Sequence, residues 1–424
     1  MDASEYYRLR YPYPKLVELL TCNGDELYHF EFAVEGVSPD GSEIYKRYVS
    51  ASTAQELKEA VLRMPNVKTF HFGPIYTGKP EPKGKEGRNC SVPIRRVLSF
   101  DIDLTDYDWL KLDDAAGKPS LEKCDAAYPV SAIALYLLKR LLIEAFAFTK
   151  ILMVYSGRRG VHVHVFDEAA MALSNEGRCA VACYLNNKLT TNKTLRSDDD
   201  VRRLVFMHNM KSTVYRLFET VVVGKMDLFG RLDARVDFVH RLEVEKYSNL
   251  ANGTLLSLAD DAMEPDSGQE AWEFIKQKVH GCGISWMADR LDAVVLAYVW
   301  PRLDFHVTAK LDHLTKVPFA AHGKSRRVSV AIDPNNIEGF DPASAPMLDT
   351  FDDDAMAAAV QRFRIAPTAA PARGLDPDDL GAVCDLEDLA RAAPKRVLQP
   401  YAQGRERLQQ RRVGKERKRS PLAP

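Results

Sequence analysis

Two aspartates separated by one residue follow a run of apolar residues, and this spacing suits the binding of a metal ion. Residues 96–104 are predicted to form a strand, in which residues two apart share a face about 6.6 Å apart at Cα. Asp101 and Asp103 therefore lie on one face, while Phe100 and Ile102 lie on the other. Neighbouring carboxylates repel unless a cation lies between them, and Mg²⁺ is usually held by one or two carboxylates plus substrate phosphates. An exposed strand edge with two ordinary aspartates is the alternative.

A glycine- and arginine-rich turn, residues 156–160, separates two apolar stretches. Its glycines allow a tight turn and a close approach to a ligand, and Arg158 and Arg159 offer forked donors that suit phosphate oxygens. After the turn, valines alternate with His162 and His164, so one strand face is core and the other presents two imidazoles. A hairpin with solvated arginines and, for the two imidazoles, a metal site are the alternatives.

A third group of polar residues surrounds Asp304. A strand predicted at residues 303–308 would place Arg302, Asp304 and His306 on one face. Arg-Leu-Asp also occurs at two other places in the chain, so the tripeptide alone is weak evidence. Only this copy is followed by a basic and histidine-rich stretch, which contains Lys310, His313, Lys316 and His322.

Three aspartates on separate strands, surrounded by arginine, lysine and histidine, are what two-metal nucleotidyl transfer requires. In that reaction two cations about 3.5–4 Å apart bind the attacking 3′-oxygen and the leaving pyrophosphate. Basic side chains hold the triphosphate and offset the charge that develops in the transition state. The pattern favours this chemistry, with Mg²⁺ or Mn²⁺ bound by Asp101, Asp103 and Asp304.

The elements that must position these residues form a strand-rich core with a helical insertion. Periodicity predicts strands at residues 28–34, 44–50, 70–76, 96–104, 151–155, 161–166, 303–308 and 327–332. It predicts helices at residues 53–64, 130–148, 179–189, 201–223, 269–280 and 285–299. We therefore expect a core formed by 1–167 and 296–365, a helical subdomain at 168–295, and a linker, short helix and basic tail at 366–424.

Length and composition exclude several classes of protein. The 424 residues are 46% hydrophobic and 28% charged, with 58 Lys+Arg against 59 Asp+Glu, which argues against a histone-like protein that coats nucleic acid by bulk charge. No apolar run approaches the roughly 20 residues that span a bilayer, and the acidic N-terminus is unlike a secretory signal. The seven scattered cysteines indicate a reducing compartment, cytosol or nucleus.

The C-terminal segment differs from the rest in charge. Residues 403–419 hold eight Lys/Arg and two Glu, a charge of +6, which leaves −7 for the rest of a chain whose total is −1. The stretch at 416–421 could be a nuclear-localisation signal or part of a solvated, disordered tail.

From about residue 6 to residue 333, the chain resembles the small, catalytic subunit of eukaryotic-type DNA primase, of the archaeo-eukaryotic primase superfamily. The blocks at 100–108 (FDIDLTDYD) and 155–162 (YSGRRGVH) are highly specific together. The others, in order, are Tyr6-Tyr7-Arg8, Phe30-Glu31-Phe32, Ile44-Tyr45-Lys46-Arg47-Tyr48, Pro301-Arg302-Leu303-Asp304 and the stretch from Lys316 through Pro318 and Phe319 to His322.

The resemblance implies an α+β fold, a mixed-sheet catalytic core interrupted by a helical subdomain. It implies that Asp101, Asp103 and Asp304 are the metal-binding catalytic triad. The implied nucleotide-binding residues are Ser156, Arg158, Arg159, His162, Arg302, Lys316 and His322, with Arg47 as a further contact. The implied activity is synthesis of short RNA primers on single-stranded DNA from ribonucleoside triphosphates, in the nucleus. The implied partners are a large iron–sulfur primase subunit and the replicative polymerase alpha complex, without a membrane.

Three departures from the family pattern stand out. The family carries a structural zinc site after the first aspartate block, but here residues 111–129 hold only Cys124 and the chain has no CxxC. Because a tetrahedral site needs four ligands, we predict that zinc is absent and that packing holds this segment. Recruitment of distant ligands by Cys124 is the alternative. Tyr28-His29 replaces an Arg-Glu pair, and His164 replaces an aromatic residue.

Two other readings compete with an RNA-primer polymerase. One is a stand-alone primase–polymerase or repair polymerase of the same superfamily that uses deoxynucleotides; the chain shows no recognisable extra helicase or zinc-knuckle module. The other is a non-catalytic scaffold subunit, against which the three intact aspartates argue.

Overall fold

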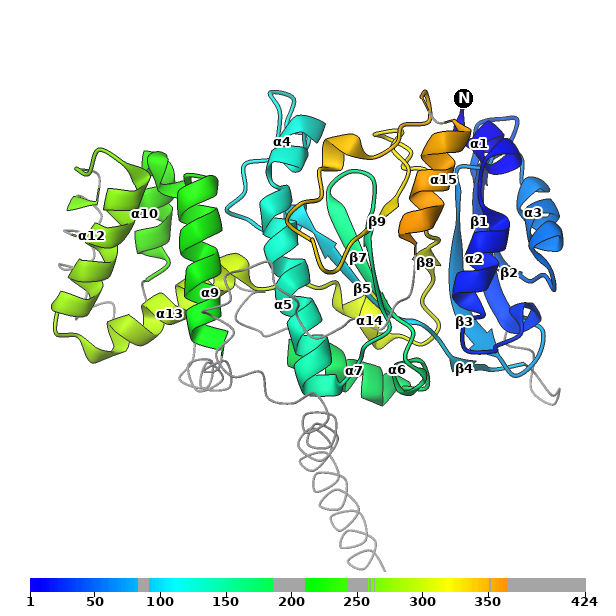
Figure 1. The fold of residues 1–424 in the computed structure, drawn as a ribbon, viewed down its shortest axis with the longest axis horizontal. Coiled ribbons are helices and arrows are strands. Elements are labelled where there is room, and N and C mark those ends of the chain that lie inside the picture. The colour runs from blue at the N-terminus through cyan, green and yellow to red at the C-terminus, as the bar shows by residue number, and fades with distance from the viewer. Residues whose placement is uncertain are drawn as a thin grey trace, which may run out of the picture.

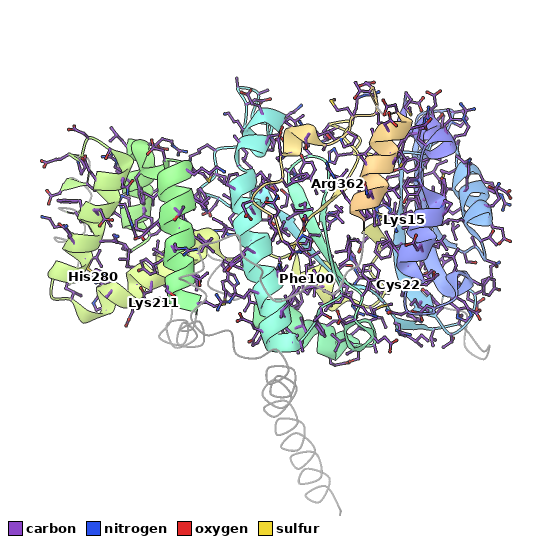
Figure 2. All side chains as sticks on the ribbon, viewed as in Figure 1. Lys15, Cys22, Phe100, Lys211, His280 and Arg362 are labelled. Carbon is purple, nitrogen blue, oxygen red and sulfur yellow. The ribbon has the colours of Figure 1, made fainter. Side chains whose placement is uncertain are left out.

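A computed structural model describes residues 1–82, 91–185, 210–242, 258, 261–262, 264–350 and 352–363. Two antiparallel sheets and a group of helices lie side by side along the long axis of the molecule (Figure 1). Lys15 and Cys22 mark one end, Lys211 and His280 mark the helical end, and Phe100 lies between them (Figure 2). Among the described helices, none is long and apolar enough to cross a membrane.

The first sheet has the strand order β2-β1-β3-β4, with β8 also paired to β3. Its strands are β1 (Phe30–Val37), β2 (Glu43–Val49), β3 (Thr69–Tyr76), β4 (Pro93–Arg95) and β8 (Thr315–Lys316). The helices α1 (Ala3–Leu9), α2 (Tyr13–Leu20) and α3 (Ala54–Leu62) lie beside it (Figure 1). The aromatic residues near the N-terminus are buried, and Tyr6 and Tyr11 donate hydrogen bonds to carbonyl oxygens of Phe319 and Pro318. This sheet is therefore tied to the chain segment that follows Lys316.

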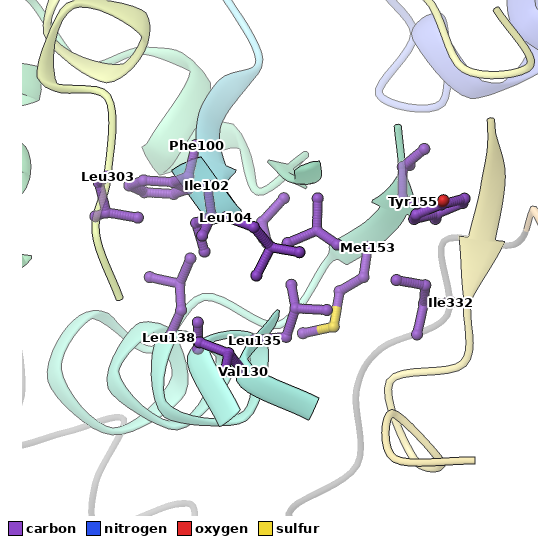
Figure 3. Packing of buried hydrophobic residues seen from close by; sticks show 14 of the residues in the cluster. Phe100, Ile102, Leu104, Val130, Leu135, Leu138, Met153, Tyr155, Leu303 and Ile332 are labelled. Carbon is purple, nitrogen blue, oxygen red and sulfur yellow. The ribbon is translucent and has the colours of Figure 1, made fainter. Parts of the chain in front are cut away.

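The second sheet has the order β5-β7-β6-β9 and carries the first aspartates. Its strands are β5 (Leu98–Asp103), β6 (Ile151–Tyr155), β7 (Gly160–Val165) and β9 (Val330–Ile332). One face packs on α5 (Tyr128–Phe146), where Phe100, Ile102 and Leu104 meet Leu135 and Leu138 (Figure 3). Because this face is fully apolar, the alternation along β5 turns its two aspartates away from the core.

Helices occupy most of the described residues between β7 and β9. They are α6 (Glu168–Met171), α7 (Asn175–Leu185), α9 (Lys211–Leu217), the π-helix η4 (Phe218–Lys225), α10 (Leu232–His240), α12 (Gly268–Gly281), α13 (Ser285–Val299) and α14 (Phe305–Ala309). At the helical end an aromatic cluster forms the core, with Trp272 stacked on Phe229 and edge-on to Phe218 and Phe238. The remaining elements are η1 (Leu27–His29), η2 (Leu104–Asp106), α4 (Leu121–Ala126), η5 (Leu228–Gly230), η7 (Pro342–Ser344) and α15 (Asp353–Arg362).

The α+β class is confirmed, but two details of the prediction are wrong. Every strand pairing in the described part of the chain is antiparallel, so the sheets are not mixed. The strand predicted at 303–308 is the helix α14, and only Leu303 makes a bridge, to Ile102. The period-two argument for Arg302, Asp304 and His306 therefore fails, because Asp304 caps the helix instead of pairing along a strand.

The remaining predicted elements mostly stand near their predicted positions. The predicted helix at 201–223 is found as α9 and η4 from Lys211 onward, and its first residues lie outside the described part. Of the strand predicted at 327–332, only Val330–Ile332 is found, as β9. The linker, short helix and basic tail predicted at 366–424, including the candidate localisation signal, also lie outside the described residues.

Candidate active site

Two elements that are distant in sequence bring the three aspartates together. Asp101 and Asp103 stand at the end of β5, and Asp304 is the N-cap of α14. The backbone N–H of Asp304 donates to the carbonyl oxygen of Asp101 at 3.0 Å, directly beside the bridge between Ile102 and Leu303. These three carboxylates, the acidic side of the site, therefore come from one strand and one helix start, not from separate strands.

Hydrogen-bond donors of the protein orient two of the three carboxylates, those of Asp103 and Asp304. One oxygen of Asp103 accepts from Arg159 Nε at 2.8 Å, and the other accepts from the backbone N and Oγ1 of Thr105 at 2.9 and 2.8 Å. Asp304 accepts from the backbone N of His306 at 2.8 Å. Both carboxylates are thus held by local hydrogen bonds at the positions that the backbone gives them.

Negative charge on the acidic side is only partly compensated. Burial raises the pKa of Asp101, the neighbouring Asp103 and Asp304 raise it further, and His162 and Lys316 oppose the shift. His162 Nε2 lies 3.5 Å from Asp101 Oδ1, because the two residues are register partners in β5 and β7. Burial also raises the pKa of Asp106, with Asp103 and Asp101 adding to the effect. A cation placed here would relieve this repulsion.

The donor set of the acidic side fits a divalent cation by chemistry. Carboxylate oxygens are the hard ligands that Mg²⁺ and Mn²⁺ prefer, and three stand at neighbouring backbone positions. Asp103 and Asp304 accept hydrogen bonds from protein donors, however, and no group of three or more His, Cys, Asp or Glu in the described ranges converges closely enough to hold a metal ion. Binding a cation therefore requires the three carboxylates to turn toward one another.

A tight turn between β6 and β7 brings the arginines to the same end of the sheet. Ser156 N donates to Gly160 O at 2.9 Å, and Gly160 N donates to Ser156 Oγ at 3.1 Å. Gly157 has a φ of +99°, and a Cβ there would lie 2.9 Å from the Cβ of His322 and 3.1 Å from the carbonyl oxygen of Arg327. Only glycine fits this close approach, which places the turn against the segment around His322.

A group of cations surrounds a neutral histidine beside that turn. Burial, together with the nearby charges of Lys316, Arg158, Arg159 and Lys324, lowers the pKa of His322 to about 4. The Nδ1 atom of His322 accepts from the backbone N–H of Lys324 and Ser325 at 3.3 and 3.2 Å. We call His322 and these four cations the basic group. Like charges gathered around an uncharged ring form a site that an anion such as a triphosphate would stabilise.

The predicted nucleotide-binding residues do not all join the basic group. Arg302 is 13% exposed and pairs with Asp108 at 2.9 Å, over the ring of Tyr107. Arg47 forms a two-bond ion pair with the fully buried Glu31, at 2.8 and 3.1 Å. Both guanidinium groups therefore take part in ion pairs within the protein. The site itself contains the other predicted residues, which are Ser156, His162, Lys316 and the two arginines of the turn.

Sequence reasoning missed Lys324 and the pair that braces the turn. Arg327 makes two bonds to Asp125, at 2.7 and 2.9 Å, and a third to Tyr155 Oη at 3.2 Å, which in turn donates to the carbonyl oxygen of Arg158. The basic run from 322 to 327 was the available signal for Lys324 and Arg327. No local pattern pointed to Asp125, because it lies 202 residues from Arg327.

Described residues between Lys111 and Pro129 are held by ordinary contacts. Asp113 and Pro119 form a bridge, and Lys123 Nζ donates to the carbonyl oxygen of Asp113 at 2.6 Å. Cys124 is buried on α4, next to the ion pair of Asp125. These contacts are of the kind that the predicted packing requires, and the absence of zinc stays a prediction.

His164 is buried beneath the site. Its Nδ1 lies 3.0 Å from Ser99 Oγ, and its ring packs edge-on against Phe72. Burial lowers its pKa well below the usual value. This side chain therefore joins the two sheets in the core and does not face the triphosphate side.

An acidic side next to a basic group on an α+β core defines a nucleotidyltransferase. Comparison with known families agrees: residues 100–334 match the DNA primase small subunit family. The DNA primase small subunit of Schizosaccharomyces pombe is 29% identical over 356 residues, covering 81% of this chain and 75% of that protein. The DNA primase small subunit of Drosophila melanogaster is 30% identical over 323 residues, covering 72% of this chain and 70% of that protein.

The likeness extends beyond eukaryotes. The DNA primase small subunit PriS of Halorubrum lacusprofundi is 25% identical over 264 residues, covering 60% of this chain and 62% of that protein. This chain belongs to the DNA primase small subunit family, and it is a primase, an enzyme that synthesises RNA primers.

Proposed function

We propose that the chain makes short RNA primers on single-stranded DNA from ribonucleoside triphosphates, with Asp101, Asp103 and Asp304 as the metal-binding residues. The observation that carries this proposal is the backbone bond between Asp304 and Asp101, which joins the third carboxylate to the first two. Two bound Mg²⁺ or Mn²⁺ ions would supply activation of the attacking 3′-oxygen and charge stabilisation at the leaving pyrophosphate.

The chain's own residues then have separate tasks. The acidic side provides the oxygen ligands, while Lys316 and the arginines of the turn bind the triphosphate and offset its charge. His322 stays neutral above its depressed pKa of about 4 and offers a ring that can donate one hydrogen bond to phosphate. Arg302 and Arg47 are further proposed nucleotide contacts, and each is also held in an ion pair, with Asp108 and with Glu31.

The assay of this proposal uses the purified chain with its large subunit, an oligo-pyrimidine single-stranded DNA and labelled ribonucleotides, in Mg²⁺ or Mn²⁺. Short labelled RNA is the expected product. A complete lack of product would contradict the enzyme reading and favour a scaffold subunit. Parallel reactions with deoxynucleotides test the stand-alone polymerase alternative, which requires deoxynucleotides to be the better substrates.

The partners and the place of action follow from the same proposal. We propose a large iron–sulfur primase subunit and the polymerase alpha complex as partners, and the nucleus as the location. We also propose that residues 1–167 and 296–365 form the catalytic core and residues 168–295 a helical subdomain. Support for this division comes from the aromatic cluster at the helical end, where Trp272 is stacked on Phe229. Other buried residues connect this cluster to the core beneath β5.

A further inference from the structure

Arg96, two residues before β5, is a buried arginine whose acceptors are all neutral. Its side chain is 1% exposed. Its Nη1 donates to the carbonyl oxygens of Val307 and Lys310, both at 2.8 Å, and its Nη2 donates to Thr315 Oγ1 at 3.0 Å. Burial and, to a smaller extent, the nearby Arg178 lower its pKa to about 9, with Asp312 opposing the shift. A guanidinium in such a place is costly to bury, so its bonds need a structural explanation.

Those three acceptors belong to two elements, one that carries part of the acidic side and one that carries part of the basic group. Val307 lies within α14, the helix that Asp304 caps, and Lys310 directly follows that helix. Thr315 is the first residue of β8, and Lys316 is the second. One guanidinium therefore joins the helix that presents a metal-binding carboxylate to the strand that presents a cation of the basic group.

These two elements are too short to hold their positions alone. α14 has five residues and β8 has two, so neither gains much stability from its own hydrogen bonds. α14 lies against β5 and α7 (Figure 1), and Thr308 Oγ1 donates to the carbonyl oxygen of Ser99 at 3.1 Å. Arg96 provides the link from this helix to β8.

A second buried arginine fixes the backbone of the first. Arg178 of α7 donates from Nη2 to the carbonyl oxygen of Arg96 at 2.6 Å and to that of Met171 at 3.0 Å. The backbone N–H of Arg96 donates to the same Met171 oxygen at 3.1 Å. The start of β5 is thus anchored to α7, and the guanidinium of Arg96 projects from a fixed point.

We propose that Arg96 is a positioning residue that sets the separation between Asp304 and Lys316, and with it the fit of the site to a metal-bound triphosphate. This inference rests on the proposed function. Lysine cannot replace the side chain, because a single ammonium group lacks the planar fork that reaches acceptors on two elements.

The test measures binding without turnover. Arg96→Lys is expected to weaken Mn²⁺ binding, measured by electron paramagnetic resonance, and binding of a fluorescent ribonucleoside triphosphate, measured by anisotropy, each by about tenfold or more. Thr315→Val removes only the bond to β8 and is expected to weaken nucleotide binding alone. Arg95→Lys is the matched control, because the neighbouring Arg95 pairs with Asp25 on the other side of the strand, at 2.9 Å.

A folded Arg96→Lys protein with a lowered melting temperature but both affinities unchanged would overturn the proposal and make Arg96 purely structural. Should that variant fail to fold, Thr315→Val decides: selective loss of nucleotide affinity supports the proposal, and no loss, or equal loss of both affinities, contradicts it. Wild-type protein that makes no primer would instead count against the proposed function.

Discussion

The acidic side and the basic group both hold like charges close together, but the chain builds them differently. The aspartates are carried by β5 and by the first turn of α14, and a backbone hydrogen bond joins Asp304 to Asp101. The cations of the basic group stand mainly on loops, gathered by a glycine turn and by the ion pair of Arg327 with Asp125. Regular structure fixes the proposed metal ligands, whereas close packing of loops fixes the proposed phosphate contacts.

This difference suggests that each side responds to a different kind of change. Removing a carboxylate from the acidic side relieves repulsion and leaves the backbone in place, so chemistry should suffer without loss of stability. Disturbing the loops of the basic group should cost stability as well as nucleotide affinity. The following predictions test that contrast, from the largest expected effect to the smallest.

Asp101→Ala should lower primer synthesis by about a thousandfold, because it removes one of the proposed ligands of the charge-stabilising metal. The melting temperature should stay the same or rise, since the substitution relieves a carboxylate with a raised pKa. Asp289→Ala, at an exposed position on α13, is the control. Retained synthesis in the Asp101 variant would mean that the metal site lies elsewhere.

Gly157→Ala should lower the free energy of unfolding by about 2–3 kcal/mol, because a side chain at this positive φ is strained and its Cβ meets His322. The Michaelis constant for nucleotide should rise in parallel. Gly283→Ala is the matched control, with a φ of +70° but open space around the new Cβ. Equal destabilisation of the two variants in urea unfolding would show that the contact with His322 contributes nothing.

Acidification should destabilise the protein through its buried histidines. Burial lowers the pKa of His71 to about 4, with Lys316, His313 and His162 adding to the effect. The unfolded chain therefore binds more protons than the folded one between about pH 6.5 and pH 4, and stability falls as pH falls through that window. From pH 7 to pH 5 the loss should be about 2 kcal/mol for this group.

His71→Gln should remove that part of the pH dependence, as measured by urea unfolding at both pH values. The unsubstituted protein, measured under the same conditions, serves as the control. An unaltered dependence in the His71 variant would mean that this histidine is protonated in the folded protein.

Arg159→Ala should raise the Michaelis constant for nucleotide by about tenfold, equivalent to about 1.4 kcal/mol, with a smaller effect on turnover. The guanidinium contributes to the basic group and also orients Asp103 at 2.8 Å. Arg140→Ala, on α5 and paired with Glu144, should leave the constant unchanged. A fall in turnover alone would assign Arg159 to the acidic side instead.

The zinc prediction has its own measurement. Mass spectrometry of the pure protein should find no bound zinc, because Cys124 is the one cysteine in the segment where the family carries its ligands. One zinc ion per chain would show that Cys124 recruits distant ligands.

The chain order of β5, the turn and β7 was readable from the sequence because strand alternation and turn chemistry are local. The same-face placement of Asp101 and Asp103 followed from a period of two, and the buried helix α5 followed from its apolar surface. The pattern of alternating residues gave the wrong secondary structure after Asp304. The short segment after it alternates like a strand, yet its aspartate accepts from the amide of His306 and starts a helix.

By itself the sequence determined the residue types of the site and the strand that carries two of its carboxylates. The tertiary structure alone decided that Arg158 and Arg159 join the stretch from Lys316 to Lys324 around His322, because the two segments lie far apart in the sequence. It also decided that Arg302 and Arg47 are engaged by Asp108 and Glu31. Ion pairs form between groups that are close in space, and spacing along the chain predicts that closeness only within a single helix, strand or turn.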